Sequence, residues 1–201
     1  MIGNQRNPSI YIHCGAFCYI RMKSMCISNC AAWAIEYPAY FLHYHILQLM
    51  KNPVEIRKLA RQRLHEAEIL FSHGKSDGAF YLAGYAAELS LKAKICERLG
   101  IPNLLDDSFS DPGETKGVHE IRRSIRTHNL LTLLILGGLK SRFDSEKATN
   151  VTLSTASSLL LSAWDEKARY KPCGHFLDRD VERIIELLSD ANGLLTWIEQ
   201  H

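Results

Sequence analysis

The stretch that decides the fold is residues 77–100, DGAFYLAGYAAELSLKAKICERLG. Its apolar and small side chains fall on almost every face of a helix rather than along one stripe, which is typical of a buried helix. Asp77 is suited to capping the start of this helix, and Gly100 followed by Pro102 is a stop signal. The sequence therefore predicts a central helix over residues 77–99, around which the other elements pack.

Amphipathic segments lie on both sides of this stretch. The run Asn52-Pro53-Val54-Glu55 places a capping residue, then proline at the first helical position, then Glu at the third. Residues 102–118 are rich in Pro, Asp and Gly and predict a loop. Apolar residues recur with the helical period in four further segments, namely 53–73, 130–136 with Thr127 as its cap, 151–168, and 178–198 with Asp178 as its cap. No alternating strand pattern competes, so we expect an all-α antiparallel helical bundle of about four to five helices.

The composition changes near residue 50. We interpret residues 1–49 as an N-terminal extension outside the core, which would fit translation from an upstream start codon, and residues 50–201 as the helical bundle. The longest uncharged run, residues 37–50, is shorter than the roughly 20 apolar residues that cross a bilayer, so we expect no membrane association. We therefore expect a cytoplasmic protein.

Four of the six cysteines fall in the first 30 residues, at positions 14, 18, 26 and 30. Their C-x3-C spacing differs from the C-x2-C spacing that suits tetrahedral zinc. We interpret them as free thiols in a reducing compartment, and we expect neither a metal site nor a cofactor. With a net charge of only +2, any phosphate binding has to come from a local basic cluster.

Glu88 and Lys92 are charged residues inside the otherwise apolar central stretch, four positions apart. Glu preceding Lys at this spacing forms a favourable pair on a helix. In a central helix the pair would be partly desolvated, and each charge would need its partner. The pair is either a structural salt bridge or part of a functional site, and Tyr81 and Tyr85 would supply hydroxyls to the same patch.

The segment from His119 to His128 is rich in possible chemistry. Arg122, Arg123 and Arg126 concentrate positive charge just before the predicted helix at residue 130, where free backbone N–H groups also favour an anion. The same helix dipole would disfavour a protonated His128 and leave it available as a neutral base. Such an imidazole beside arginines suits phosphodiester cleavage, with His128 taking a proton from a ribose 2′-OH and arginine stabilising the phosphorane. The alternative is a basic surface loop in which His128 forms part of the helix cap.

The chain resembles the HEPN family over roughly residues 53–198. The similarity is carried by four stretches, which are RLHEAE at 63–68, GAFYLAGYAAELSLKA at 78–93, THNL at 127–130 and WDEKARY at 164–170. Ribonuclease members carry an Arg-x4-6-His motif. Arg123 and His128 fit it with four intervening residues, and Arg122 with His128 and Arg169 with His175 fit it as well.

This resemblance implies an all-α bundle that forms homodimers and acts on or binds RNA or nucleotides. One branch would be a metal-independent endoribonuclease of a toxin–antitoxin or phage-defence system, with Arg123 and His128 catalytic and Arg122, Arg126, Arg169 and Lys171 binding phosphate. Arg169 and Lys171 could equally form a structural helix end. The alternatives are a non-catalytic binding module partnering a nucleotidyltransferase or antitoxin, and a purely structural dimer.

Overall fold

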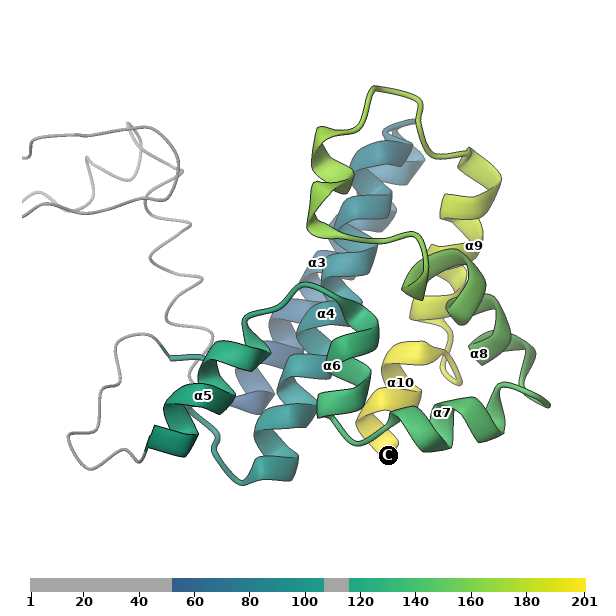
Figure 1. Cartoon of the computed structure of the whole chain (residues 1–201). Helices are drawn as coiled ribbons and strands as arrows, with labels where there is room; N and C mark the ends of the chain where they lie inside the picture. The colour runs from purple at the N-terminus through teal and green to yellow at the C-terminus, as the bar shows by residue number, and fades with distance from the viewer. Residues whose placement is uncertain (1–51, 107–115) are drawn as a thin grey trace, which may run out of the picture. The chain divides into compact units, whose positions relative to one another are not determined.

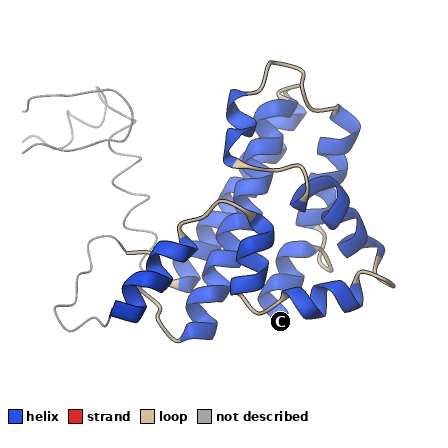
Figure 2. Ribbon diagram, in the orientation of Figure 1, coloured by secondary structure: helices blue, strands red, loops and turns tan. Residues whose placement is uncertain are grey.

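The computed structural model describes residues 52–106 and 116–201, and every regular element within them is helical (Figure 2). The α-helices are α3 (Pro53–Ser72), α4 (Ser76–Leu99), α5 (Lys116–Ile125), α6 (Leu130–Leu136), α7 (Lys140–Glu146), α8 (Val151–Thr155), α9 (Asp178–Ser189) and α10 (Leu194–Gln200). A π-helical segment, η2 (Ala156–Leu161), continues α8, and a 3-10 helix, η3 (Glu166–Tyr170), follows it. The all-α prediction is confirmed. The expected extension at residues 1–49, with its four cysteines, lies outside the described residues.

Helix α4 is the centre of this arrangement, as its apolar sequence predicts. It runs beside α3 along most of its length and also contacts α6, α9, α10 and η3 (Figure 1). Its buried residues lie on several faces, among them Phe80, Leu89 and Ile95. Gly100 ends the helix in the left-handed conformation, with φ 66°. Among the described helices, none combines the length and the apolar composition that a bilayer span requires.

The expected number of about four to five helices is not confirmed. Helices α5 and α7 were not predicted, and the two predicted helices at 151–168 and 178–198 are each broken. The second break is caused by Gly193, whose N–H donates to the Asp190 carbonyl at 2.8 Å. A Cβ at Gly193 would lie 2.4 Å from the Leu187 carbonyl oxygen, so the turn between α9 and α10 requires glycine.

The predicted helix at 151–168 is interrupted so that Trp164 can pack against α4. Trp164 is buried, and its Nε1–H donates to the Tyr81 carbonyl at 3.1 Å. Its indole occupies the space where any other residue at position 84 would carry a side chain, because a Cβ on Gly84 would lie 2.1 Å from the indole Cδ1. Asp165 then accepts the Lys167 N–H at 2.9 Å and starts η3. The indole therefore fixes where η3 lies against the central helix.

Asp77 lies inside the first turn of α4, whose N-cap is Lys75, so its predicted capping role is wrong. Its carboxylate instead accepts the N–H groups of Gly174 at 2.6 Å and Phe176 at 3.1 Å. Burial acts to raise the pKa of Asp77, but these backbone donors outweigh it and the pKa falls below its ordinary value. Phe176 also stacks on Phe80 with ring centroids 3.7 Å apart. The segment after η3 is thereby fastened to the start of α4.

Candidate active site

A stripe of polar side chains runs along one face of α4. Tyr81, Tyr85, Glu88 and Lys92 are spaced by four, three and four residues, which places them above one another on a helix. Glu88 is 1% exposed and Lys92 is 6% exposed. Lys92 Nζ lies 2.6 Å from Glu88 Oε1, so the ion pair expected from the spacing is present and is buried. A buried charge without a partner is strongly destabilising, so each member of this pair compensates the other.

The second partner of Glu88 is His128, which lies forty residues further along the chain. His128 Nδ1 is 3.1 Å from each of the two Glu88 carboxylate oxygens. A carboxylate can only accept, so Nδ1 carries the hydrogen and donates it, which leaves Nε2 as the ring nitrogen for chemistry. The His128 side chain is 48% exposed, so this nitrogen belongs to an imidazole that solvent and ligands can reach.

This geometry corrects the expectation that His128 is held neutral by the helix dipole. The hydrogen bond that His128 donates to Glu88 raises the pKa of His128 above its ordinary value, although burial and the charge of Lys92 act in the opposite direction. The charges of Glu88 and Glu166 also raise this pKa. A buried carboxylate in direct contact stabilises the imidazolium more than the end of a short helix destabilises it.

The backbone around His128 is held by two side-chain turns. Asn129 is the N-cap of α6 and accepts the Thr132 N–H at 2.8 Å, so Thr127 is not the cap as predicted. Thr127 Oγ1 instead accepts the Asn129 N–H at 3.1 Å. His128 lies between these two hydrogen-bonded residues, and Leu130 immediately after them is buried in the core. The imidazole is therefore held toward α4 by its own loop.

Tyr85 adds a phenol to the same face of α4. Burial raises the pKa of Tyr85 to about 12, and the negative charge of Glu88 acts in the same direction. The hydroxyl is consequently neutral throughout the physiological range and can donate a hydrogen bond. Arg63 on α3 is the positive charge that opposes this shift; its guanidinium pairs with Glu66 at 2.7 Å. Arg63 was not predicted to lie at this site, because nothing in its local sequence places it near α4.

The arginines of the basic segment lie on or next to a helix rather than in a loop. Helix α5 contains Arg122 and Arg123, and Arg126 follows its last residue. Arg122 Nη1 donates to the Asp106 carbonyl at 3.3 Å and is partly buried, whereas Arg123 and Arg126 are exposed. Joint action of Arg123 with His128 stays a prediction. The spacing of Val118, Ile121 and Ile125 is the signal that could have revealed α5.

Arg169 on η3 is brought directly to the stripe on α4. Its Nη1 lies 3.4 Å from the Tyr81 hydroxyl, and its guanidinium carbon is 6.0 Å from the centre of the Tyr81 ring. The guanidinium also covers the Tyr170 ring at 4.9 Å. Lys171, the next basic residue, is exposed at the end of η3. Arg169, which was predicted to bind phosphate, therefore contacts the α4 stripe.

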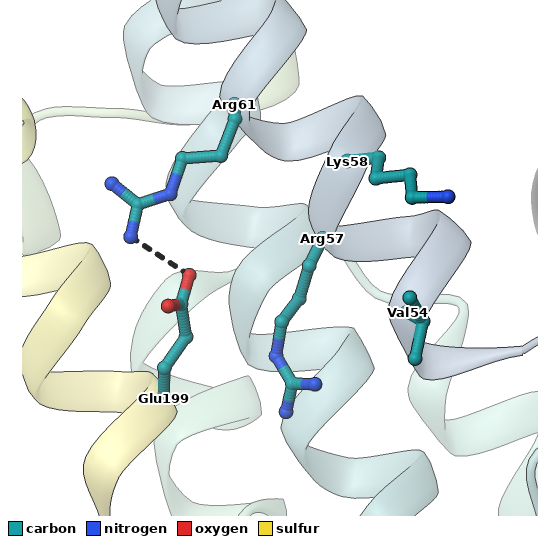
Figure 3. Close-up of a pocket in the computed structure, with 5 residues that line it drawn as sticks. All are labelled: Val54, Arg57, Lys58, Arg61 and Glu199. Carbon is teal, nitrogen blue, oxygen red and sulfur yellow. Dashed lines mark hydrogen bonds and ion pairs between the residues drawn. The ribbon is translucent and has the colours of Figure 1, made fainter.

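A separate pocket lies between α3 and α10 (Figure 3). Its lining residues are Val54, Arg57, Lys58, Arg61 and Glu199. Figure 3 shows Arg61 reaching Glu199, at 2.9 Å, while Lys58 extends away from it. Arg57 pairs with Glu97 of α4, and Lys58 pairs with Glu55 at 2.9 Å. Because each cation already has a carboxylate partner, we interpret this pocket as an ion-paired contact between helices rather than an anion site.

Searches with this chain match no protein-family profile, no curated protein and no solved structure. Within the described residues, no three His, Cys, Asp or Glu side chains gather as metal ligands would. The two cysteines described, Cys96 and Cys173, are free thiols, the first buried and the second exposed. The candidate site is therefore defined by its own geometry, with Glu88 at the centre and Lys92, His128 and Tyr85 around it.

Proposed function

We propose that this chain is a HEPN-type, cytoplasmic endoribonuclease that cleaves RNA without a metal, with His128 as its proton-transfer group. The observation that carries the proposal is the contact between His128 Nδ1 and the buried carboxylate of Glu88. A carboxylate in this position fixes the imidazole tautomer and orientation and stabilises the positive charge that the ring acquires when it accepts a proton. Because the His128 side chain is 48% exposed, a substrate can reach the ring, as a proton-transfer group requires.

The reaction follows from what the imidazole can do. His128 Nε2 accepts the proton of a ribose 2′-OH, and the 2′-oxygen attacks the adjacent phosphorus. The bond from phosphorus to the 5′-oxygen breaks, a 2′,3′-cyclic phosphate forms, and the imidazolium returns its proton to the departing 5′-oxygen. Glu88 stabilises the imidazolium between these two steps. General acid–base catalysis of this kind contributes about 10²- to 10⁴-fold to a rate.

Arginine supplies the second requirement, which is stabilisation of the charge on the pentacoordinate phosphorus. Arg123 is the proposed clamp, because it is exposed on α5 only three residues before the loop that carries His128. A guanidinium offers a fork of donors that matches two phosphate oxygens. In this proposal Arg122 and Arg126 contribute positive potential along the path of the RNA.

The pH dependence follows from the raised pKa of His128. A base must be unprotonated at the start, so kcat/KM should rise with pH through the His128 pKa, which lies above its ordinary value of about 6.5. Glu88→Gln removes the negative charge that raises the pKa. The rising limb of the profile should therefore move to lower pH in that variant, while the maximum rate falls because the imidazolium loses its stabilising partner.

The test is cleavage of a fluorescently labelled RNA, with a chelator present, by the wild type and by His128→Ala, Arg123→Ala and Glu88→Gln. His65→Ala is the matched control, because His65 is exposed on α3 and also contacts a carboxylate, that of Glu68 at 3.3 Å. We expect His128→Ala to lose at least 100-fold in rate and His65→Ala to lose nothing. Cleavage at an equal rate by His128→Ala would overturn the proposal.

The outer face of α6 favours a second candidate function, a non-catalytic module that binds a partner chain. Leu131 is 41% exposed, Ile135 is 55% exposed and Leu136 is 40% exposed, so this helix presents apolar side chains on the side that does not face α4. Exposed apolar residues grouped in this way mark association surfaces. In this reading the partner is a second copy of the chain, a nucleotidyltransferase or an antitoxin.

The first test of the exposed apolar face of α6 is whether the chain forms a homodimer through it. Ile135→Glu should abolish a dimer seen in analytical ultracentrifugation, because a carboxylate would have to be desolvated in the interface. Val151→Glu is the control, since Val151 is 70% exposed on α8. A dimer that survives Ile135→Glu excludes this face as the homodimer interface.

A further inference from the structure

Tyr170 is the most exposed large aromatic residue in the described part of the chain, with 75% of its surface accessible. It occupies the last position of η3, and the Arg169 guanidinium lies over its ring at 4.9 Å. Burial of its own ring contributes little to stability at this exposure. The side chain is therefore available to a ligand on the ring face that Arg169 does not cover.

The ring of Tyr170 is the outer end of a row of flat groups that leads from the candidate active site. Tyr85 and Tyr81 stack with centroids 6.4 Å apart, and Arg169 follows over Tyr81 at 6.0 Å and then over Tyr170. Trp164 also stacks against Tyr81, with ring centroids 6.3 Å apart. These groups are fixed by the contacts of η3 with α4, so the row does not depend on a ligand to form.

We propose that Tyr170 and Arg169 form a stacking platform for an unpaired base of single-stranded RNA. This inference rests on the proposed function, because it names the substrate class of the same site. The base would stack on the free face of the Tyr170 ring, with Arg169 on the opposite face. The exposed cations of Arg169 and Lys171 lie where phosphates flanking that base would pass.

The separation of Tyr170 from the end of η3 that lies near His128 suits a base that flanks the cleaved bond. It does not suit the base at the bond itself. Glu166, at the other end of η3, is close enough to His128 to act on its charge. Four residues of a 3-10 helix rise about 8 Å, so Tyr170 lies roughly that distance along η3 from Glu166. Stacked bases repeat every 3.4 Å or so along a strand, so the length of η3 between Glu166 and Tyr170 corresponds to about two base steps.

Single-stranded RNA is favoured over a duplex by the nature of the platform. A side chain can stack on a base only when the base is not already stacked and paired in a helix. Aromatic platforms of this kind contribute about 1–3 kcal/mol for each base when tested by alanine substitution. We therefore expect Tyr170→Ala to weaken binding by about 5- to 150-fold, while Tyr170→Phe, which retains a ring, binds within about threefold of the wild type.

The experiment measures the Kd for a labelled eight-nucleotide RNA, whose 2′-oxygens carry methyl groups so that it cannot be cleaved, by fluorescence anisotropy at one fixed salt concentration. The RNA is used as a single strand, as a duplex, and as a strand with one abasic position that keeps every phosphate but lacks that base. Each position is made abasic in turn. Leu177→Ala is the control variant, because Leu177 is 54% exposed on the same connection and carries no ring.

The expected result is that Tyr170→Ala weakens the single strand, has no effect on the duplex, and loses its effect when one particular position is abasic. Equal binding of all three RNAs by the wild type and Tyr170→Ala would overturn the platform. So would an equal loss on every abasic strand, which would reveal a general change in charge or folding. A loss of self-association in Tyr170→Ala, with RNA binding unchanged, would assign the ring to a protein contact instead.

Failure of the platform and failure of the proposed reaction give different results. RNA binding that depends on Tyr170, without cleavage that depends on His128, leaves the platform standing and removes the nuclease. Cleavage that depends on His128, with the same KM in Tyr170→Ala as in the wild type, leaves the nuclease standing and removes the platform.

Discussion

The buried pair of Glu88 and Lys92 allows a direct test of how much a desolvated charge pair contributes to the stability of the fold. The Glu88 side chain is 1% exposed and that of Lys92 is 8% exposed, with Lys92 Nζ 2.6 Å from the carboxylate. Glu88→Leu would remove the carboxylate and leave the Lys92 ammonium in an apolar environment. An uncompensated buried charge of this kind destabilises a fold by about 3–5 kcal/mol. With a urea m-value of about 2 kcal/mol/M, the unfolding midpoint should fall by about 1.5–2.5 M.

The double variant Glu88→Leu/Lys92→Met removes both charges at once. It therefore measures the net contribution of the pair to the free energy of unfolding, without leaving one charge unpaired. Replacement of a buried pair by apolar residues of similar size is often neutral or stabilising, so we expect a stability within about 1 kcal/mol of the wild type. The double variant should nevertheless lose the proposed cleavage, because His128 loses the carboxylate that its Nδ1 contacts. Stability would then be regained without activity.

The assay is urea unfolding followed by circular dichroism, at a pH near 7 and constant ionic strength. Lys58→Met is the control for an exposed pair, since Lys58 contacts Glu55 at 2.9 Å with 67% of its side chain exposed. It should change the free energy of unfolding by no more than about 1 kcal/mol. If Glu88→Leu has as small an effect as Lys58→Met, the reasoning about a desolvated pair is refuted.

Two further predictions concern the packing and the titration of the site. Gly84→Ala should lower the free energy of unfolding by about 1–3 kcal/mol, because its Cβ would lie 2.1 Å from Trp164, and tryptophan fluorescence should shift to the red. Gly117→Ala, which meets nothing within 4 Å, should instead be neutral or slightly stabilising, and an equal loss in both variants would contradict the packing argument. In NMR titrations the pKa of His128 should lie above about 6.5 and should fall in Glu88→Gln. Because the folded-state pKa is the higher one, the stability that His128 adds over His128→Ala is full below about pH 6.5 and is lost as the pH rises through the folded pKa. If the difference in unfolding free energy between the wild type and His128→Ala does not vary with pH, this prediction is contradicted.

Local signals in the sequence were sufficient for the main architecture. The uninterrupted apolar character of residues 77–99 predicted that α4 is central, and Asn52 with Pro53 predicted where α3 begins. The pairing of Glu88 with Lys92 also followed from local spacing, because residues four apart on a helix are neighbours whatever the tertiary structure. These predictions succeeded because each depends on residues within one or two helical turns.

Predictions that depended on distant neighbours did not succeed in the same way. Asp77 has the right residue type for a cap, but a loop almost a hundred residues later supplies the N–H groups that it accepts. The break before η3 is caused by Trp164 packing on Gly84, and neither residue signals the other in the sequence. Helix α5 was missed because a Pro-, Asp- and Gly-rich stretch precedes it.

Some features of the candidate site likewise depend on neighbouring residues, and others depend on residues that are distant in the sequence. Taken alone, the sequence determined the helical class, the central helix and the polar stripe on it, because helical periodicity is a property of neighbouring residues. Only the tertiary structure decided that His128 reaches Glu88 from forty residues away, and that Arg169 joins the row beginning at Tyr85. The tertiary structure also decided the direction of the His128 pKa shift, since folding brings the buried Glu88 carboxylate against the imidazole.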